Sequence, residues 1–136
     1  MPERARDWFR QAEHDCRHAR TAAAAGDHDW ACFAAQQAAE KVLRALAERR
    51  GGEAWGHSLL ALVGALAEVE PEIASLREAA IRLDRYYIQT RYPNGFDAGA
   101  PADYFLEADS RQATVDAESI IAFVGRRLSG PFPRDR

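Results

Sequence analysis

The chain has 136 residues and a formal net charge of −3, which excludes a histone-like, polybasic class of nucleic-acid binder but leaves room for a local basic patch. This length predicts one domain, and 47% hydrophobic with 29% charged residues indicates a globular protein. The longest apolar stretch, residues 59–67, is too short to span a membrane. The N-terminal residues lack a signal-peptide pattern, so we expect a cytoplasmic protein.

Helical periodicity runs through the first half of the sequence, and no segment alternates as a strand would. Apolar residues spaced by three and four predict a first helix over about residues 3–25, ended by Gly26. A second helix is predicted from a cap at Asp27 or Asp29 to about Arg49, before a Gly-Gly break.

Three further helices are predicted in the second half. Ser58 is the candidate N-cap of the third helix, whose apolar stripe extends to Val69. A fourth helix is expected from Pro71 to about Thr90, and a last one over about residues 102–128. Short connections between five helices predict an all-α, antiparallel up-and-down bundle of four to five helices. We expect one domain over residues 1–128 and a frayed C-terminal tail over residues 129–136.

The second helix has two unlike faces. One face carries small and aliphatic residues suited to close packing, whereas the opposite face combines aromatic and polar side chains. Its members are Trp30, Phe33, Gln37, Glu40, Lys41 and Arg44. Lys41 is the only lysine, beside 17 arginines. Either this face, with Trp30, Phe33 and Gln37, forms a dimer or ligand interface, or another helix covers the aromatics and Glu40–Arg44 is an ordinary i,i+4 pair.

Metal and cofactor binding are not expected. His14 and His18 have a metal-compatible i,i+4 spacing, but they project away from the apolar stripe and no third ligand accompanies them. Cys16 and Cys32 are isolated and are interpreted as packing residues.

The end of the fourth helix and the start of the third carry the remaining candidates. Arg91 and Tyr92 could hold a base or phosphate, or Arg91 could cap the carbonyls of its own helix. Tyr87 is interpreted as a packing residue. His57 could be a base, a hydrogen-bonding cap or a surface residue.

Four segments of the chain form a recognisable pattern. They are Trp8-Phe9-Arg10-Gln11-Ala12-Glu13-His14-Asp15, Phe33-x-x-Gln36-Gln37-Ala38-Ala39-Glu40-Lys41, His57-Ser58-Leu59 and Leu83-Asp84-x-Tyr86-Tyr87-x-x-Thr90-Arg91-Tyr92-Pro93. In their order and spacing these segments resemble the HEPN domain family (higher eukaryote and prokaryote nucleotide-binding) over about residues 3–128. The resemblance implies a bundle of four or five helices that commonly dimerises.

The resemblance implies two kinds of function. Many members are metal-independent ribonucleases, often toxins, with an arginine followed four to six residues later by a histidine; others lack that motif and accompany a minimal nucleotidyltransferase. No histidine follows Arg91 in this chain. The pair Arg50-x6-His57 has a permitted spacing but straddles a glycine turn, and we interpret it as coincidental.

We therefore expect a homodimeric nucleotide- or RNA-binding protein, without the usual ribonuclease motif, that partners a minimal nucleotidyltransferase in a toxin–antitoxin type of system. Lys41, His57, Arg91 and Tyr92 are the expected ligand contacts. The first alternative is a metal-independent ribonuclease toxin with a nonstandard site that includes His57 and Arg91. The second is a dimerising helical module with only a structural role.

Overall fold

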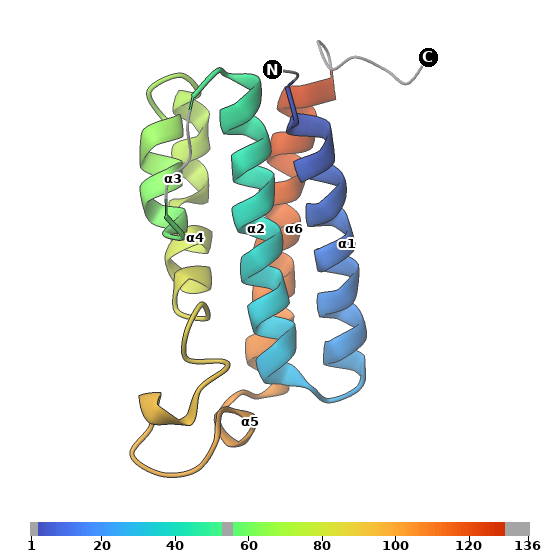
Figure 1. Ribbon diagram of the computed structural model, residues 1–136, viewed down its shortest axis with the longest axis vertical. Helices are drawn as coiled ribbons and strands as arrows, with labels where there is room; N and C mark the ends of the chain where they lie inside the picture. Colours follow the sequence, from blue (N-terminus) through green and yellow to red (C-terminus); the bar gives the residue numbers. More distant parts are fainter. Residues whose placement is uncertain (1–2, 53–55, 130–136) are drawn as a thin grey trace.

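Three long helices form the main body of the molecule. The computed structural model describes residues 3–52 and 56–129. Helix α1 (Ala5–Ala24) and α2 (His28–Arg49) lie side by side, and α6 (Glu107–Ser129) packs against both (Figure 1). The described residues contain no strand, and the predicted all-α bundle is confirmed.

Shorter elements cover the other side of α2. They are α3 (Leu59–Leu66), the 3₁₀ helix η1 (Pro71–Leu76) and α4 (Arg77–Asp84). A loop with the 3₁₀ helix η2 (Pro93–Gly95) and α5 (Pro101–Tyr104) then extends from one end of the bundle before α6 begins (Figure 1). Helix α2 is thus packed on two sides, by long helices on one and by short ones on the other.

Alanine dominates the packing between the long helices. Ala12 of α1, Ala35 and Ala39 of α2, and Ala117 of α6 are fully buried. Small side chains let helix backbones approach closely, since interaxial distance follows the side chains at the contact. Larger aliphatic residues fill the layer between α2 and the short helices, where α3 contributes Leu59 and α4 contributes Leu83.

The predicted fourth helix is wrong in its extent. Residues 71–76 form a 3₁₀ helix, and the α-helical part ends at Asp84 instead of about Thr90. Beyond Asp84, side chains instead of backbone amides donate to the carbonyls of Tyr86 and Tyr87. The Thr90 hydroxyl donates to the Tyr86 carbonyl at 2.7 Å, and the Arg91 guanidinium donates to the Tyr87 carbonyl. These bonds hold residues 85–92 in a compact, non-helical segment.

Two other predicted boundaries also differ. Helix α3 ends at Leu66, so Val69 lies beyond it and is 59% exposed instead of extending the apolar stripe. The expected last helix is split: the Asp109 carboxylate accepts the Leu106 amide at 2.8 Å, which starts a new helix at Glu107. Asp27 occupies the N-cap position of α2, but its side chain accepts no capping hydrogen bond.

The two cysteines are free and buried, in agreement with a packing role. Burial raises the pKa of Cys32 to about 12 and also raises the pKa of Cys16. No helix in the described part of the chain combines the length and apolarity needed to cross a membrane. The tail predicted from residue 129 lies outside the described residues from 130 onward, whereas Ser129 still belongs to α6.

Candidate functional site

A cluster of aromatic and imidazole rings lies where residues 84–92 cross α2. The His57 and Tyr87 rings stack with centroids 4.4 Å apart and planes 19° from parallel. Phe33 of α2 lies 6.4 Å from Tyr87, and Trp30 meets Phe33 edge to face at 6.2 Å. We call these four residues, together with Tyr92, the ring cluster. Three separate segments of the chain therefore meet at one surface.

Arg91 joins the ring cluster through its guanidinium. The guanidinium carbon lies 4.2 Å from the Phe33 ring centroid, 5.0 Å from that of Tyr87 and 5.2 Å from that of Tyr92. Its Nε also donates to the Tyr87 carbonyl at 3.0 Å. This bond differs from the capping role considered for Arg91, because Tyr87 lies in the turn after α4, which ends at Asp84. The same geometry puts a delocalised cation among aromatic faces, an arrangement with favourable cation–π energy.

His57 is held by a buried carboxylate. Its Nδ1 lies 3.0 Å from Oε2 of Glu40, a side chain that is only 8% exposed. Because the carboxylate accepts, Nδ1 carries the proton and Nε2 is left on the other side of the ring. The imidazole itself is 52% exposed. This pairing orients the ring through Nδ1 and leaves Nε2 without a hydrogen bond to the described residues.

The Glu40 carboxylate is part of a polar network inside α2. The buried Gln36 amide donates to Glu40 at 3.2 Å, and Gln37 donates to Gln36 at 2.8 Å. Arg44 pairs with Glu40 at 3.2 Å, which confirms the expected i,i+4 pair, and reaches the Gly56 carbonyl at 2.6 Å. Gly56 has a φ of +73°, a conformation that favours glycine. His57 and the residue before it are thus both bound to α2.

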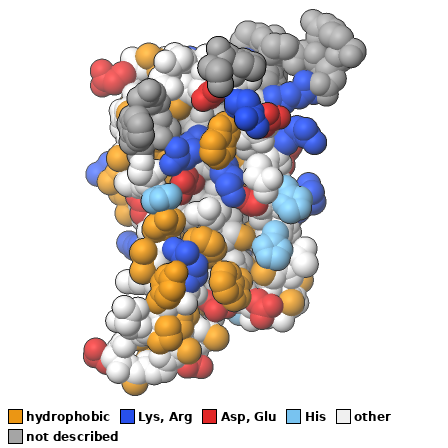
Figure 2. Space-filling view, in the orientation of Figure 1, with side chains coloured by type: hydrophobic (Ala, Val, Ile, Leu, Met, Phe, Trp, Pro, Cys, Tyr) orange, Lys and Arg blue, Asp and Glu red, His pale blue; other side chains and the backbone are white. Residues whose placement is uncertain are grey.

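An open hollow of about 450 Å³ adjoins the stacked rings. We call it the His57 hollow; its lining residues are His57, Ser58, Asp84, Arg85, Tyr87, Ile88 and Gln89. This volume lies within the range of small-molecule sites. In Figure 2, hydrophobic side chains gather on the lower half of the visible face, next to a histidine and around basic side chains. The site therefore combines ring faces, a cation and an accessible cavity.

Asp84 forms the inner wall of the hollow and caps α3. Its Oδ1 accepts the Leu59 amide at 2.7 Å and its Oδ2 accepts the Leu60 amide at 3.1 Å. The predicted cap Ser58 also acts, since its hydroxyl accepts the Ala61 amide at 3.1 Å. Because two capping groups occupy the amides of the first turn, the helix terminus itself is closed to an external anion.

Arg85 is a site residue that the sequence did not reveal. It is exposed, it lines the His57 hollow, and no hydrogen bond or ion pair engages its guanidinium within residues 3–52 and 56–129. The segment that forms its backbone was predicted to be helical, and in a helix Arg85 would diverge from Arg91. Its own backbone stays helical, with φ −65° and ψ −18°, and the turn that follows brings Tyr87, Ile88 and Gln89 into the lining beside it.

Several predicted residues lie apart from the hollow. Lys41 is paired with Asp15 of α1 at 2.5 Å and is one quarter exposed. Arg50 binds Glu70, whereas His57 binds Glu40, so the two members of the Arg50-x6-His57 pair engage different carboxylates. Phe33 is covered in part by Arg91 and Tyr87, but Trp30 stays 51% exposed. Phe33 is therefore covered in part within the chain, whereas an interface role for Trp30 stays a prediction.

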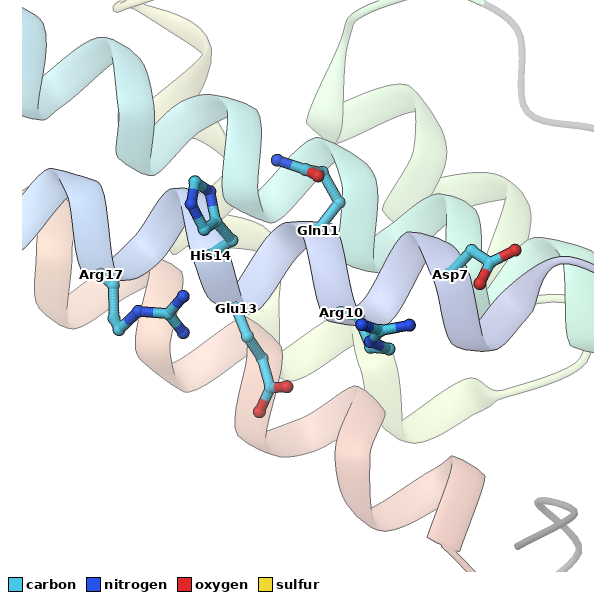
Figure 3. A pocket seen from close by; sticks show the side chains of 6 residues that line it. All are labelled: Asp7, Arg10, Gln11, Glu13, His14 and Arg17. Carbon is cyan, nitrogen blue, oxygen red and sulfur yellow. The ribbon is translucent and has the colours of Figure 1, made fainter. Parts of the chain in front are cut away.

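A second hollow, of about 510 Å³, lies along the outside of α1 (Figure 3). The labelled side chains, which include Arg10, His14 and Arg17, spread along the helix and do not converge on one point (Figure 3). His14 is 3.9 Å from the Asp15 carboxylate. Among the described residues there is no group of three or more side chains that could hold a metal ion.

Known structures resemble this chain over most of its length. The crystal structure of TT1696 from Thermus thermophilus is 47% identical, with a TM-score of 0.89, and the match covers 93% of this chain and all of that one. An archaeal HEPN homologue, ST0689, is 34% identical with a TM-score of 0.79, over 93% of this chain and 99% of that chain. A HEPN domain protein of Thermotoga maritima, tm0613, is 30% identical with a TM-score of 0.75, and the match covers 91% of this chain and 98% of that chain.

No curated protein matches the sequence significantly. The family model described as "HEPN domain" matches residues 5–128, a range that includes all three segments of the ring cluster. Together with the two HEPN relatives at 34% and 30% identity, this match shows that the chain belongs to the HEPN domain family.

Proposed function

We propose that the chain binds nucleotides or RNA at the ring cluster and the adjoining His57 hollow. The observation that carries the proposal is the Arg91 guanidinium set among Phe33, Tyr87 and Tyr92, next to the half-exposed ring of His57. Unpaired bases stack on aromatic, histidine and arginine planes, and each such stack contributes about 1–3 kcal/mol. The adjoining hollow is lined by the rings of His57 and Tyr87 and by the cation Arg85, which suits a base better than it suits an apolar metabolite.

The proposed cellular role is that of a cytoplasmic partner of a minimal nucleotidyltransferase, in a toxin–antitoxin type of system. The absence of any histidine after Arg91 supports a binding role, because the family's usual ribonuclease pair is not formed there. An exposed Trp30 edge to face with Phe33 supports a homodimer interface at the start of α2. Light scattering of Trp30→Asp should show a monomer, and an unchanged dimer would contradict that interface.

The test of ligand binding compares two arginines. Purified protein is titrated with a fluorescent pentanucleotide RNA, and Arg91→Ala is expected to weaken binding about tenfold, because one stacking cation is lost. Arg91→Lys keeps the charge but loses the planar fork, and should remain well below the wild type. Arg111→Ala is the control, since Arg111 pairs with exposed Glu107 on α6. Equal binding by all four proteins would contradict the proposal.

A second candidate function is metal-independent ribonuclease activity, which the His57–Glu40 contact favours. A carboxylate that orients Nδ1 leaves Nε2 to accept a proton from a 2′-hydroxyl, and Arg91 lies against the same Tyr87 ring. Cleavage of mixed RNA in chelator should then be lost in His57→Ala and reduced in Glu40→Gln. If the wild-type protein cleaves no RNA, the ribonuclease function is contradicted and the binding function remains. If neither the His57 nor the Arg91 variants change RNA binding, the remaining hypothesis is a dimerising helical module with only a structural role.

A further inference from the structure

The His57 hollow is lined by one arginine, Arg85, whose guanidinium has no ion-pair partner among residues 3–52 and 56–129. Arg85 is exposed at its edge, and no carboxylate or carbonyl engages its guanidinium within the described part of the chain. An arginine in this state offers its forked N–H groups to a ligand, and the geometry of that fork matches a phosphate.

The neighbouring cations are already engaged. Arg82 makes a bidentate pair with Asp116, with bonds of 2.8 and 2.9 Å. Arg44 binds Glu40 and the Gly56 carbonyl, and Arg91 binds the Tyr87 carbonyl between aromatic rings. Recruiting Arg82 or Arg44 for a ligand would break an existing ion pair, and for Arg82 would leave the carboxylate of Asp116, only 5% exposed, without its partner. Among these four arginines, all in the described part of the chain, Arg85 is the one that can bind an anion without such a loss.

The part of the hollow lined by Asp84 and the start of α3 does not attract an anion. Helix α3 begins there, but Asp84 accepts the Leu59 and Leu60 amides, and its own negative charge faces the hollow. An anionic group is therefore repelled from the α3 side and drawn to the Arg85 side. The half-exposed His57 ring also lines the hollow, and its face away from the stacked Tyr87 ring can stack with the base.

We propose that Arg85 binds the phosphate of the ligand, so that the site selects nucleotides over nucleosides. This inference rests on the proposed binding function and specifies its substrate class. The phosphate is that of a free nucleoside monophosphate or an internucleotide phosphate of RNA, since both present the same oxygens to the guanidinium.

The test uses three probes that share one base: adenosine, AMP and an adenosine pentanucleotide without terminal phosphates. Wild-type protein should bind AMP or the pentanucleotide about tenfold more tightly than adenosine, the effect expected of one charge-assisted contact. Arg85→Ala should remove that advantage and leave adenosine binding unchanged, while Arg85→Lys should restore part of it. An effect confined to the pentanucleotide identifies RNA as the source of the phosphate, and an effect on AMP identifies a free nucleotide.

Arg77→Ala is the matched control, because Arg77 is an exposed arginine at the start of α4, the helix that ends just before Arg85, and lies outside the lining of the hollow. If Arg77→Ala weakens AMP as much as Arg85→Ala does, the effect is one of net charge and the inference is wrong. If adenosine, AMP and the pentanucleotide bind equally, only the role of Arg85 fails. If none of the three binds, the proposed binding function fails with it.

Discussion

The two sides of α2 are built on different principles. Toward α1 and α6 the helix packs through fully buried alanines, such as Ala35 and Ala39, along long, regular partners. Toward residues 57–92 it meets short helices whose ends are held by side chains, as Asp84 holds α3 and Arg91 holds the Tyr87 carbonyl. The two sides therefore have different roles. The regular side holds α2 in position, and the irregular side brings the candidate binding residues His57, Arg85 and Arg91 next to it.

The candidate site lies at the seam between these two regions. Glu40 and Phe33 come from the regular helix, whereas His57 and Tyr87 come from the irregular side. The His57 ring, which belongs to the irregular side, is therefore held in place by Glu40 of the regular helix. Perturbing each region separately should show whether this division is real.

The largest expected effect comes from enlarging a buried alanine. Ala35→Leu inserts three carbons into a contact with no exposed surface, and we expect a loss of about 3 kcal/mol in the free energy of unfolding, because overpacking forces the helices apart. Ala61→Leu, on the exposed face of α3, is the control and should change little. Urea denaturation measures both. A stable Ala35→Leu variant would show that the packing between the long helices is looser than described.

An intermediate effect is expected from the cap between α4 and α3. Asp84→Ala removes the acceptor of the Leu59 and Leu60 amides and should cost about 1–2 kcal/mol of stability. The loss should be local, with faster hydrogen exchange at the first turn of α3 and little change in α1. Asp97→Ala, in the exposed loop, serves as the control. Uniformly faster exchange throughout the molecule would contradict a division into two regions.

The smallest effect concerns Glu70, which links the two regions by binding Arg50 at the end of α2 and Arg127 of α6. Burial raises the pKa of this carboxyl, but the hydrogen bonds and charges of the two arginines outweigh burial and lower it. A lowered folded-state pKa means that the carboxylate stabilises the fold above the ordinary glutamate pKa, and that this contribution disappears as the pH falls through the folded value.

Glu70→Gln should therefore reduce stability by about 1 kcal/mol at pH 7, with the difference from wild type shrinking in strongly acidic buffer. Denaturation curves at pH 7 and pH 3 measure it. Glu78→Gln is the control, since Glu78 is 86% exposed and its carboxylate comes no closer than 3.9 Å to the Arg82 guanidinium. A difference that persists unchanged at low pH would mean that Glu70 acts through packing and not through its charge.

The long helices were predictable from sequence because their periodicity extends over many turns. The ends of the short ones were not, since their limits depend on tertiary partners. Asp84 lies 25 residues from the amide it caps, and no local pattern records such a bond. The stop after Asp84 likewise depends on Thr90 and Arg91 side chains that take over the carbonyls of Tyr86 and Tyr87.

Only part of the candidate site was predictable, because its assembly also depends on contacts between distant segments of the chain. His57, Arg91 and Tyr92 were singled out, and the structure places His57 and Arg91 against one Tyr87 ring. Tyr87 itself was assigned to packing, although it is the ring that joins them. Arg85 was missed because the sequence places it off the stripe that carries Arg91, and the hollow beside it is completed only by the turn after Asp84. Lys41 was favoured for its rarity, although its charge is paired with Asp15.

The position of α6 in the chain has a consequence for synthesis. Both α1 and α2 are translated before α6, yet their buried alanine faces are completed only when Ala113, Ala117 and Ile120 arrive. At about 5–20 residues per second, the ribosome needs several seconds to extend the chain from α2 to α6. During that interval the first two helices have an exposed apolar groove, so a chain interrupted before α6 should be a substrate for chaperones or proteases.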